Sequence, residues 1–274
     1  GKQRYSTSTN QGSTMTKIRI GCQIRPQMGT MSRMKEAWQE VEALGADTLF
    51  TWDHFFPLPL YGTTEGPHFE GYSILAAMAA TTSRVEFGML VSCNSYRNPN
   101  LLADMARTVD HISDGRHILG IGSGWFERDY VEYGYDFKSA PDRLRDLDAA
   151  MPVILNRLNT LNPGPVRGKL PIMIGGGGEK VTLRIVAQHA DIWNALGTPE
   201  ELGTKNKILD EWCHKIGRNP AEIERSVLRG FPDIVERADD YLAAGVTHFI
   251  VATGGPDWDM TLLKQMLAWR DQRG

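Results

Sequence analysis

The sequence predicts an α/β fold, a (β/α)8 TIM barrel formed by a single domain. Three observations predict it: strand-like runs alternate with helix-like segments from residue 17 onward, eight of each occur, and no change in composition marks a second domain. Eight such pairs over about 250 residues is the count of a TIM barrel. A doubly wound sheet has the same alternation, so the strand count alone leaves that fold open.

The eight expected strands are short and mostly apolar. They cover residues 18–24, 47–52, 85–91, 117–121, 171–174, 191–194, 224–229 and 247–252. In the expected helices apolar residues recur every three or four positions, as Val41 and Leu44 do. These helices cover residues 32–44, 72–82, 100–113, 142–158, 181–189, 199–216, 233–243 and 258–270. Gly45 and Gly245 each suit the end of a helix that precedes a strand.

Composition excludes several classes of function. The 274 residues are 41% hydrophobic and 23% charged, as in ordinary soluble proteins. The formal net charge of -3 gives no basic footprint for nucleic acid or an anionic membrane, and no apolar run is long enough to span a bilayer. The cysteines Cys22, Cys93 and Cys213 lack paired spacing, so neither a disulfide framework nor a metal site is expected. A cytoplasmic location is the default expectation.

Residues 1–16 differ from the rest of the chain. They are polar, rich in Ser and Thr, and lack the apolar centre of a secretory signal. We expect either a flexible N-terminal arm or residues added for expression, with the fold beginning near Lys17.

Four consecutive glycines follow the fifth expected strand. Gly175, Gly176, Gly177 and Gly178 separate an apolar run from a helix-like segment. A strand, a glycine turn and a helix start present bare backbone N–H groups to an anion and allow it to approach closely. A tight turn with no ligand explains a lone glycine run equally well. The residues after the other strands are therefore needed to choose between an anion site and a structural turn.

Polar residues also follow the second and third strands. Asp53 and His54 follow the second, where a carboxylate beside an imidazole can position a cofactor and shuttle a proton. The alternative is that Asp53 caps a turn and His54 only packs. Ser92 and Asn94 follow the third strand and could contact a ligand.

Aromatic residues follow the fourth strand and lie within the sixth. Gly120, Gly122 and Gly124 precede Trp125, in a spacing that fails the dinucleotide fingerprint. These glycines serve either packing at a strand end or a flat wall for a ring. Trp193 and Asn194 end the sixth strand, where an aromatic and an amide facing the mouth suit a ring cofactor; a buried structural Trp193 is the alternative. The sequence carries no serine nucleophile elbow and no Walker A lysine, so an organic cofactor is the natural source of chemistry.

Taken in order, these strings resemble the luciferase-like monooxygenase superfamily, and specifically its branch of coenzyme F420-dependent oxidoreductases. The resemblance covers Lys17 to about Asn194, and the remainder less distinctly. The strings that carry it are Trp52-Asp53-His54-Phe55, Tyr96-Arg97-Asn98-Pro99, Asp110 to Arg116, Gly122 to Phe126 and Ile174 to Lys180. It implies a TIM barrel that binds a flavin or deazaflavin at its C-terminal mouth, usually as a homodimer.

The resemblance also assigns roles to residues. It implies that the four glycines bind the cofactor phosphate, and that Asp53 and His54 lie near the ring, with His54 in proton transfer. Met89, Leu90 and Val91 would form a bulge behind the ring with a non-prolyl cis peptide, expected at Leu90–Val91. The remaining expected cofactor contacts are Ser92, Asn94, Gly124, Trp125, Trp193 and Asn194.

Two departures bear on the substrate. Sugar-phosphate dehydrogenases of this branch carry a Trp shortly after the Asp-His pair and a Glu after the glycine string. This chain has Leu58 and Trp125 there, which argues against glucose 6-phosphate. The stretch 156–169 is also short where larger relatives insert a flap, which predicts a more open pocket or a different lid.

The leading hypothesis is therefore an oxidoreductase that moves a hydride between F420 and an unidentified small organic substrate, with Asp53 and His54 as the catalytic pair. The first alternative is an FMN-dependent monooxygenase that uses reduced flavin and oxygen. The second is a protein that binds the cofactor without turnover. The expected homodimer interface consists of the helices at 72–82 and 100–113, whose apolar positions include Ile74, Leu75, Ala76, Met78, Ala79, Leu101, Leu102 and Met105.

Overall fold

The strands form a closed parallel barrel in the computed structural model, which describes residues 17–60 and 62–273. The strands are β1 (Arg19–Arg25), β2 (Thr48–Thr51), β3 (Glu86–Met89), β4 (Ser92–Cys93), β5 (His117–Gly122), β6 (Ile172–Gly175), β7 (Ile192–Ala195), β8 (Glu224–Arg229) and β9 (His248–Gly254). β1 pairs with β2 and β9, and β3 pairs with β5, so no edge is left open. The prediction of a single-domain TIM barrel is confirmed. The expectation for residues 1–16 lies outside the described residues.

One predicted strand is divided. Within the segment 85–91 only β3 is a strand; Leu90 and Val91 interrupt it, and the two-residue β4 follows just beyond the predicted end. β3 and β4 both pair with β5, so together they occupy one of the eight strand positions of the barrel. The interruption lies at the bulge that the resemblance implies.

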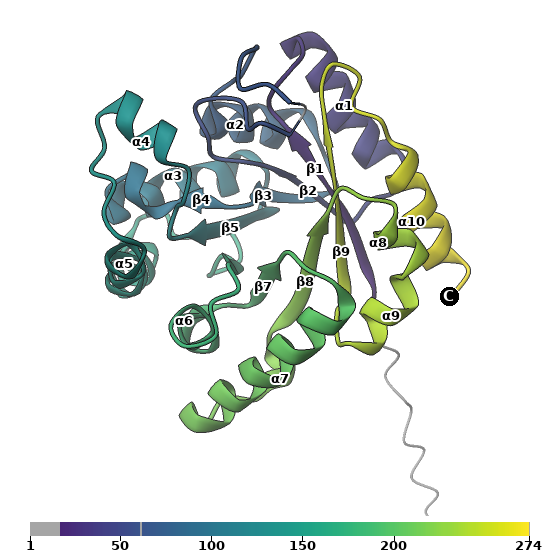
Figure 1. Cartoon of the computed structure of the whole chain (residues 1–274). Coiled ribbons are helices and arrows are strands. Elements are labelled where there is room, and N and C mark those ends of the chain that lie inside the picture. Colours follow the sequence, from purple (N-terminus) through teal and green to yellow (C-terminus); the bar gives the residue numbers. More distant parts are fainter. Residues whose placement is uncertain (1–16, 61, 274) are drawn as a thin grey trace, which may run out of the picture.

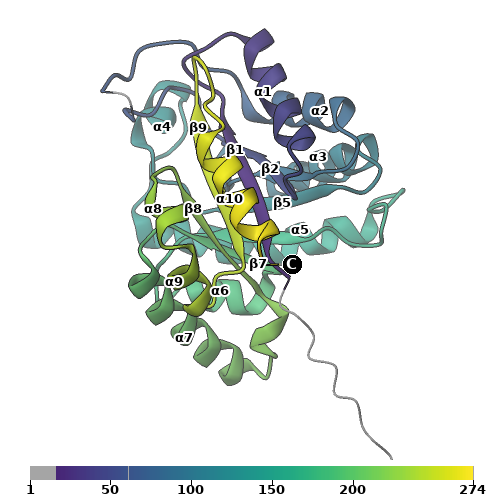
Figure 2. The ribbon, with the colours of Figure 1, turned by 90° about the vertical axis from the view of Figure 1, so that its right-hand side faces the viewer.

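The helices lie outside the strands (Figure 1). The α-helices are α1 (Met31–Ala43), α2 (Gly71–Thr81), α3 (Pro99–Ile112), α4 (Glu127–Tyr133), α5 (Ala140–Thr160), α6 (Thr182–His189), α7 (Pro199–Ile216), α8 (Asp233–Glu236), α9 (Ala238–Ala243) and α10 (Thr261–Asp271). Two 3-10 turns, η1 (Asn94–Tyr96) and η2 (Pro220–Glu222), complete the elements. Figure 2 shows α10 lying over β9 and β1.

Three helical predictions need correction. Helix α4 was not expected, because seven residues are too few to show a helical period. The segment 233–243 is two helices, because Arg237 leaves helical geometry between α8 and α9 (φ -112, ψ 23). The last helix begins at Thr261 rather than at residue 258, where Trp258 has a positive φ of 48.

Strand alternation divides the core into two layers. Inside the barrel, Phe50, Ile118, Met173, Ile192 and Ile250 pack with Leu90. A larger apolar layer fills the space between the strands and the helices. Because side chains point alternately to the two faces of a strand, this division fixes which residues can reach the mouth of the barrel.

Charged and polar side chains fill the opposite, N-terminal end of the barrel. Arg19 lies between Glu224 and Glu86, with its Nε 3.0 Å from a Glu224 carboxylate oxygen. His248 Nδ1 lies 2.7 Å from Glu224 and its Nε2 lies 2.7 Å from Thr48 Oγ1. These groups satisfy one another's hydrogen-bonding capacity. Active sites of TIM barrels lie at the other, C-terminal end of the strands. Across the described part of the chain, no helix is both long and apolar enough to cross a membrane.

Candidate active site

The bulge between β3 and β4 lies inside the barrel at its C-terminal end. The Leu90–Val91 peptide is cis, which confirms the predicted position. Three glycines make room for this segment: a Cβ on Gly120 would lie 1.9 Å from the Met89 carbonyl oxygen, and a Cβ on Gly122 would lie 2.8 Å from Val91 Cγ2. Gly175 is similarly close to Val91, at 3.1 Å. The packing alternative therefore explains Gly120 and Gly122.

Gly124 serves a different contact. A Cβ there would lie 1.9 Å from the Tyr130 hydroxyl and 2.6 Å from Cys93 Sγ, and its φ of +87 is one that side chains rarely adopt. Tyr130 donates to Ser95 Oγ at 2.9 Å. Gly124 thus lets α4 close against the loop that follows β4.

Asp53 is committed to a buried ion pair. Its two carboxylate oxygens accept from the Arg97 guanidinium at 2.7 and 2.9 Å, and one of them also accepts from the Cys93 amide at 2.8 Å. Asp53 is only 2% exposed. Burial alone would lower the pKa of Arg97, but its bonds with Asp53 raise it. Asp53 therefore holds the loop after β4 in place, and its predicted contact with a ring stays a prediction.

His54 and Asp129 form the side-chain pair best suited to proton transfer. Its Nδ1 lies 2.7 Å from a carboxylate oxygen of Asp129, a residue that is fully buried. A carboxylate only accepts, so Nδ1 carries the proton and Nε2 keeps its lone pair in the neutral ring. Nε2 forms no hydrogen bond within the described chain and is accessible to solvent. This arrangement orients an imidazole as a proton-transfer group.

Asp129 is the functional residue that the sequence analysis missed. It lies in the first turn of the unexpected helix α4, and it also accepts from the Phe55 amide at 2.9 Å and the Tyr96 hydroxyl at 3.1 Å. The signal for it was the acidic first turn, Glu127 and Asp129, directly after the glycine string.

Aromatic rings surround His54. Trp52, Trp125 and Phe126 meet its ring edge to face, with centroids 5.2, 5.7 and 5.5 Å away. Trp125 is 60% exposed, so its ring is available to a ligand. Trp52 Nε1 donates to His68 Nε2 at 3.1 Å. Burial and the nearby His54 lower the pKa of His68 to about 4, which keeps His68 neutral.

Ser92 and Asn94 differ in what they offer. The Ser92 hydroxyl is fully buried and lies 2.9 Å from the Tyr72 hydroxyl, so its bonding is internal. Asn94 is 8% exposed, and its Oδ1 is buried without a hydrogen-bond partner in the described chain. Buried acceptors are normally satisfied, so Asn94 is the member of this pair with unused capacity for a ligand.

The four glycines form the turn between β6 and α6. Gly176 has a φ of +127, and its carbonyl oxygen accepts from Trp193 Nε1 at 2.7 Å. Lys205 Nζ donates to the Gly177 carbonyl at 2.6 Å. Among residues 17–60 and 62–273, no acceptor is found for the Gly177 and Gly178 amides. The carbonyl contacts hold the turn in place, and the two amides are free to donate hydrogen bonds. Such free backbone amides can bind an anion.

The prediction that Trp193 faces the mouth is wrong. Ile192 and Asn194 point into the barrel, so Trp193 points outward into the layer beneath the helices, where it is 1% exposed. Its indole instead fixes the glycine turn. Asn194 does face inward, but its side-chain amide donates to Ser226 Oγ at 2.9 Å and its carbonyl accepts from the Gly176 amide.

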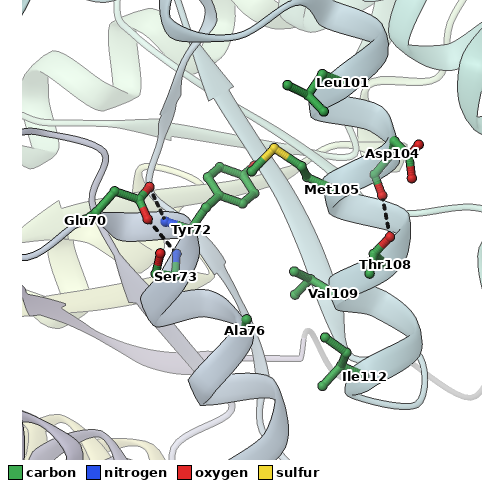
Figure 3. Close-up of a pocket in the computed structure, with 10 residues that line it drawn as sticks. All are labelled: Glu70, Tyr72, Ser73, Ala76, Leu101, Asp104, Met105, Thr108, Val109 and Ile112. Carbon is green, nitrogen blue, oxygen red and sulfur yellow. Dashed lines mark hydrogen bonds between the residues drawn. The ribbon is translucent and has the colours of Figure 1, made fainter. Parts of the chain in front are cut away.

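One groove of the described chain lies away from the mouth. It measures about 620 Å³ and separates α2 from α3 (Figure 3). Leu101, Met105 and Ile112 of α3 face Ser73 and Ala76 of α2 across it. This groove coincides with the helices expected at a dimer interface, and not with the strand ends.

Comparison with known proteins decides the family. The model of the luciferase-like monooxygenase family matches residues 11–256. The chain belongs to this family. Among its relatives, Rv0953c of Mycobacterium tuberculosis (strain ATCC 25618 / H37Rv) is 26% identical over 197 residues, which are 67% of this chain and 68% of that protein. Rv3520c of the same strain, whose name proposes a coenzyme F420-dependent oxidoreductase, is 28% identical over 62% of this chain and 53% of that protein.

A solved structure supports the same fold. An F420-dependent secondary alcohol dehydrogenase in complex with an F420-acetone adduct matches 90% of this chain and 96% of its own, with a TM-score of 0.78 and 15% identity. At this identity the match concerns the fold alone. The family description names monooxygenases and the name of Rv3520c proposes an oxidoreductase, so members of this family are oxidoreductases or monooxygenases.

The mouth of this luciferase-like barrel fits an organic cofactor. The open Gly177 and Gly178 amides suit a phosphate, the buried Asn94 Oδ1 suits a donor, and the Leu90–Val91 segment presents an apolar support. In the described chain no group of three or more His, Cys, Asp or Glu could hold a metal ion.

Proposed function

We propose that the protein is an F420-dependent oxidoreductase that transfers a hydride between the deazaflavin and a small organic substrate. The observation that carries this proposal is His54, held through Nδ1 by the buried Asp129 carboxylate with its Nε2 accessible at the barrel mouth. The membership in the luciferase-like family and the name of Rv3520c support it.

Each part of the mouth has a role in this proposal. The Gly177 and Gly178 amides of the glycine turn would bind the phosphate, and Leu90 and Val91 would support the ring. The chemistry that bound F420 supplies is acceptance or donation of a hydride. His54 Nε2 takes or returns the proton that accompanies the hydride on a substrate oxygen. Asp129 keeps His54 in the required tautomer, and Asp53 with Arg97 holds the loop beneath it.

Titration with both cofactors tests the proposal. Purified protein is titrated separately with F420 and with FMN, and ring fluorescence is followed. We expect saturable binding of F420, and unchanged affinity in H54A, because His54 acts on the proton and not on the phosphate. Tight binding of FMN with no response to F420 would replace the proposal with the second candidate, an FMN-dependent monooxygenase, which the family description favours. Binding of F420 with no substrate-dependent redox change would favour a binding protein without turnover.

The proposal includes a homodimer formed through α2 and α3. Leu101 and Ile112 are 53% and 47% exposed on the groove, an unusual position for large apolar side chains. Figure 3 shows these side chains on the face of α3 that is directed toward α2. Sedimentation equilibrium should give a dimer for the wild type and a monomer for L101D. A wild-type monomer at micromolar concentration would remove this part.

A cytoplasmic location also belongs to the proposal. Cys22, Cys93 and Cys213 are all free and buried. Reduced cysteines are typical of the reducing cytoplasm. Fractionation of cells that express the full chain would test this expectation, and its recovery outside the cytoplasm would contradict it.

A further inference from the structure

Arg25 is a cation at the barrel mouth without an acidic partner. It is the last residue of β1, and its guanidinium forms no ion pair or hydrogen bond within residues 17–60 and 62–273. Its Nε is buried and unsatisfied, and the residue as a whole is half-buried. The other arginines of these loops are paired: Arg97 with Asp53, and Arg229 with Asp233. An unpaired, partly buried guanidinium is costly, since a charged donor left without an acceptor loses its hydration.

The position of Arg25 separates it from the predicted phosphate cradle. In the barrel, β1 lies four strands from β6 in either direction, through β2, β3 and β5 or through β9, β8 and β7. The glycine turn follows β6, so Arg25 lies on the opposite wall of the mouth. An anion bound by Arg25 is therefore a second anionic group, and not the phosphate assigned to Gly177 and Gly178.

Arg25 is close to the chemistry of His54. Its guanidinium carbon lies 5.9 Å from the centroid of the Trp52 ring, and that ring lies 5.2 Å from the His54 ring. On its other side Gly230 leaves space, because a Cβ there would lie 3.3 Å from Arg25 Nη2. A guanidinium, a flat indole and an imidazole thus follow one another along one wall.

We propose that Arg25 binds the carboxylate or phosphate of the substrate, and that the reacting carbon of this substrate lies near His54. The terminal nitrogens of an arginine match two oxygens of such an anion in a bidentate pair. This inference rests on the proposed function, since it takes the mouth at His54 as the reaction site, and it adds the substrate class.

Nuclear magnetic resonance of the Arg25 Nε–H group tests the inference in the full chain. The probes are benzoate, phenyl phosphate and the neutral benzamide, with Arg229 as an internal control because Asp233 already pairs with it. We expect benzoate or phenyl phosphate to shift the Arg25 signal, and benzamide to leave it unchanged. The stronger of the two anions identifies which oxyanion the site takes. Equal shifts with benzamide, or no shift with either anion, would overturn the inference.

Two variants complete the test. R25M keeps the length of the side chain and removes the charge, so affinity for benzoate should fall by about tenfold or more, as expected for loss of hydrogen bonds to a charged group. R25K retains the charge without the planar fork, so it should recover part of that loss. Unchanged benzoate affinity in R25M would contradict the proposal. If R25M does not fold, R25K decides instead, and an R25K affinity for benzoate as high as that of the wild type would contradict the bidentate pair.

The two proposals fail separately. If F420 binds and benzoate does not, only the anion site is lost. If benzoate binds at Arg25 and F420 does not bind, the anion site stands and the cofactor assignment falls. If saturating F420 abolishes the benzoate response, Arg25 serves the cofactor and the substrate assignment falls.

Discussion

Replacement of Asp129 tests how the mouth of the barrel is held together. The carboxylate is fully buried and accepts three hydrogen bonds, from His54 Nδ1 at 2.7 Å, the Phe55 amide at 2.9 Å and the Tyr96 hydroxyl at 3.1 Å. D129A removes all three acceptor contacts, and each orphaned buried donor costs about 1–3 kcal/mol. The substitution also removes the desolvation penalty of the buried carboxylate, which offsets part of the lost hydrogen bonds. We therefore expect the free energy of unfolding to fall by about 3–5 kcal/mol.

The isosteric variant separates packing from chemistry. In D129N the side-chain oxygen can still accept from the Phe55 amide, while the new NH2 group faces His54 Nδ1. We therefore expect a smaller loss of about 1–2 kcal/mol and a change of the neutral His54 tautomer from Nδ1–H to Nε2–H. Nitrogen-15 resonances of the His54 ring report that change, and a purely structural role of Asp129 would not produce it.

Urea unfolding measures the stabilities in this series. E127A is the matched control, because Glu127 is exposed in the same first turn of α4 and should change stability by less than about 0.5 kcal/mol. If D129A is as stable as E127A, or if D129N keeps the wild-type tautomer, the assigned hydrogen-bond arrangement is wrong.

Three further predictions follow from individual contacts. G120A should be strongly destabilised, by about 3 kcal/mol or more, because its Cβ would meet a backbone carbonyl oxygen at 1.9 Å, whereas G164A, with nothing nearer than 3.8 Å, should be neutral in urea unfolding; equal stabilities would refute the packing argument. D53A should lose about 3 kcal/mol, because it removes the bidentate partner of the nearly buried Arg97, which keeps only a 3.5 Å contact with Glu70; a loss under about 1 kcal/mol would contradict that assignment. Burial lowers the pKa of His117 from 6.5 to about 4, so the unfolded chain binds more protons between these values and stability falls as pH falls through that window. The contribution of His117 between about pH 7.5 and about pH 5.5 is about 1 kcal/mol, which H117Q should remove from the measured pH dependence; an identical slope in both proteins would count against it.

The sequence was a good guide to the barrel because the repeated units carry local signals. Strands such as 247–252 are short, mostly apolar runs between helices whose period is visible over ten or more residues. Caps add to this: Pro99 is the first residue of α3, and Asn98 Oδ1 accepts from the Asn100 amide at 2.8 Å. Helix α4 has neither the length nor a capping side chain, so its acidic first turn is a weak signal on its own.

The site was harder to predict because its contacts join distant segments. Asp53 and Arg97 are separated by 44 positions and His54 and Asp129 by 75, so neither pair has a local signature. Both carboxylate oxygens of Asp53 pair with Arg97, and its expected contact with a ring stays a prediction. The acid that orients His54 lies in the unexpected helix α4. Trp193 was misplaced for another reason. In a parallel strand buried on both faces, apolar residues occupy both alternations, and only the contacts of its neighbours show which one faces the mouth.

Equilibrium dialysis against an equimolar mixture of F420 and FMN tests the central claim most directly. The protein retained after dialysis is denatured, and the released cofactor is identified by mass spectrometry. The proposed oxidoreductase should retain F420 in preference to FMN, with the same preference in H54A, because the glycine turn and the Leu90–Val91 support are unchanged. Preferential retention of FMN by the wild-type protein would contradict the claim that this barrel is an F420-dependent enzyme.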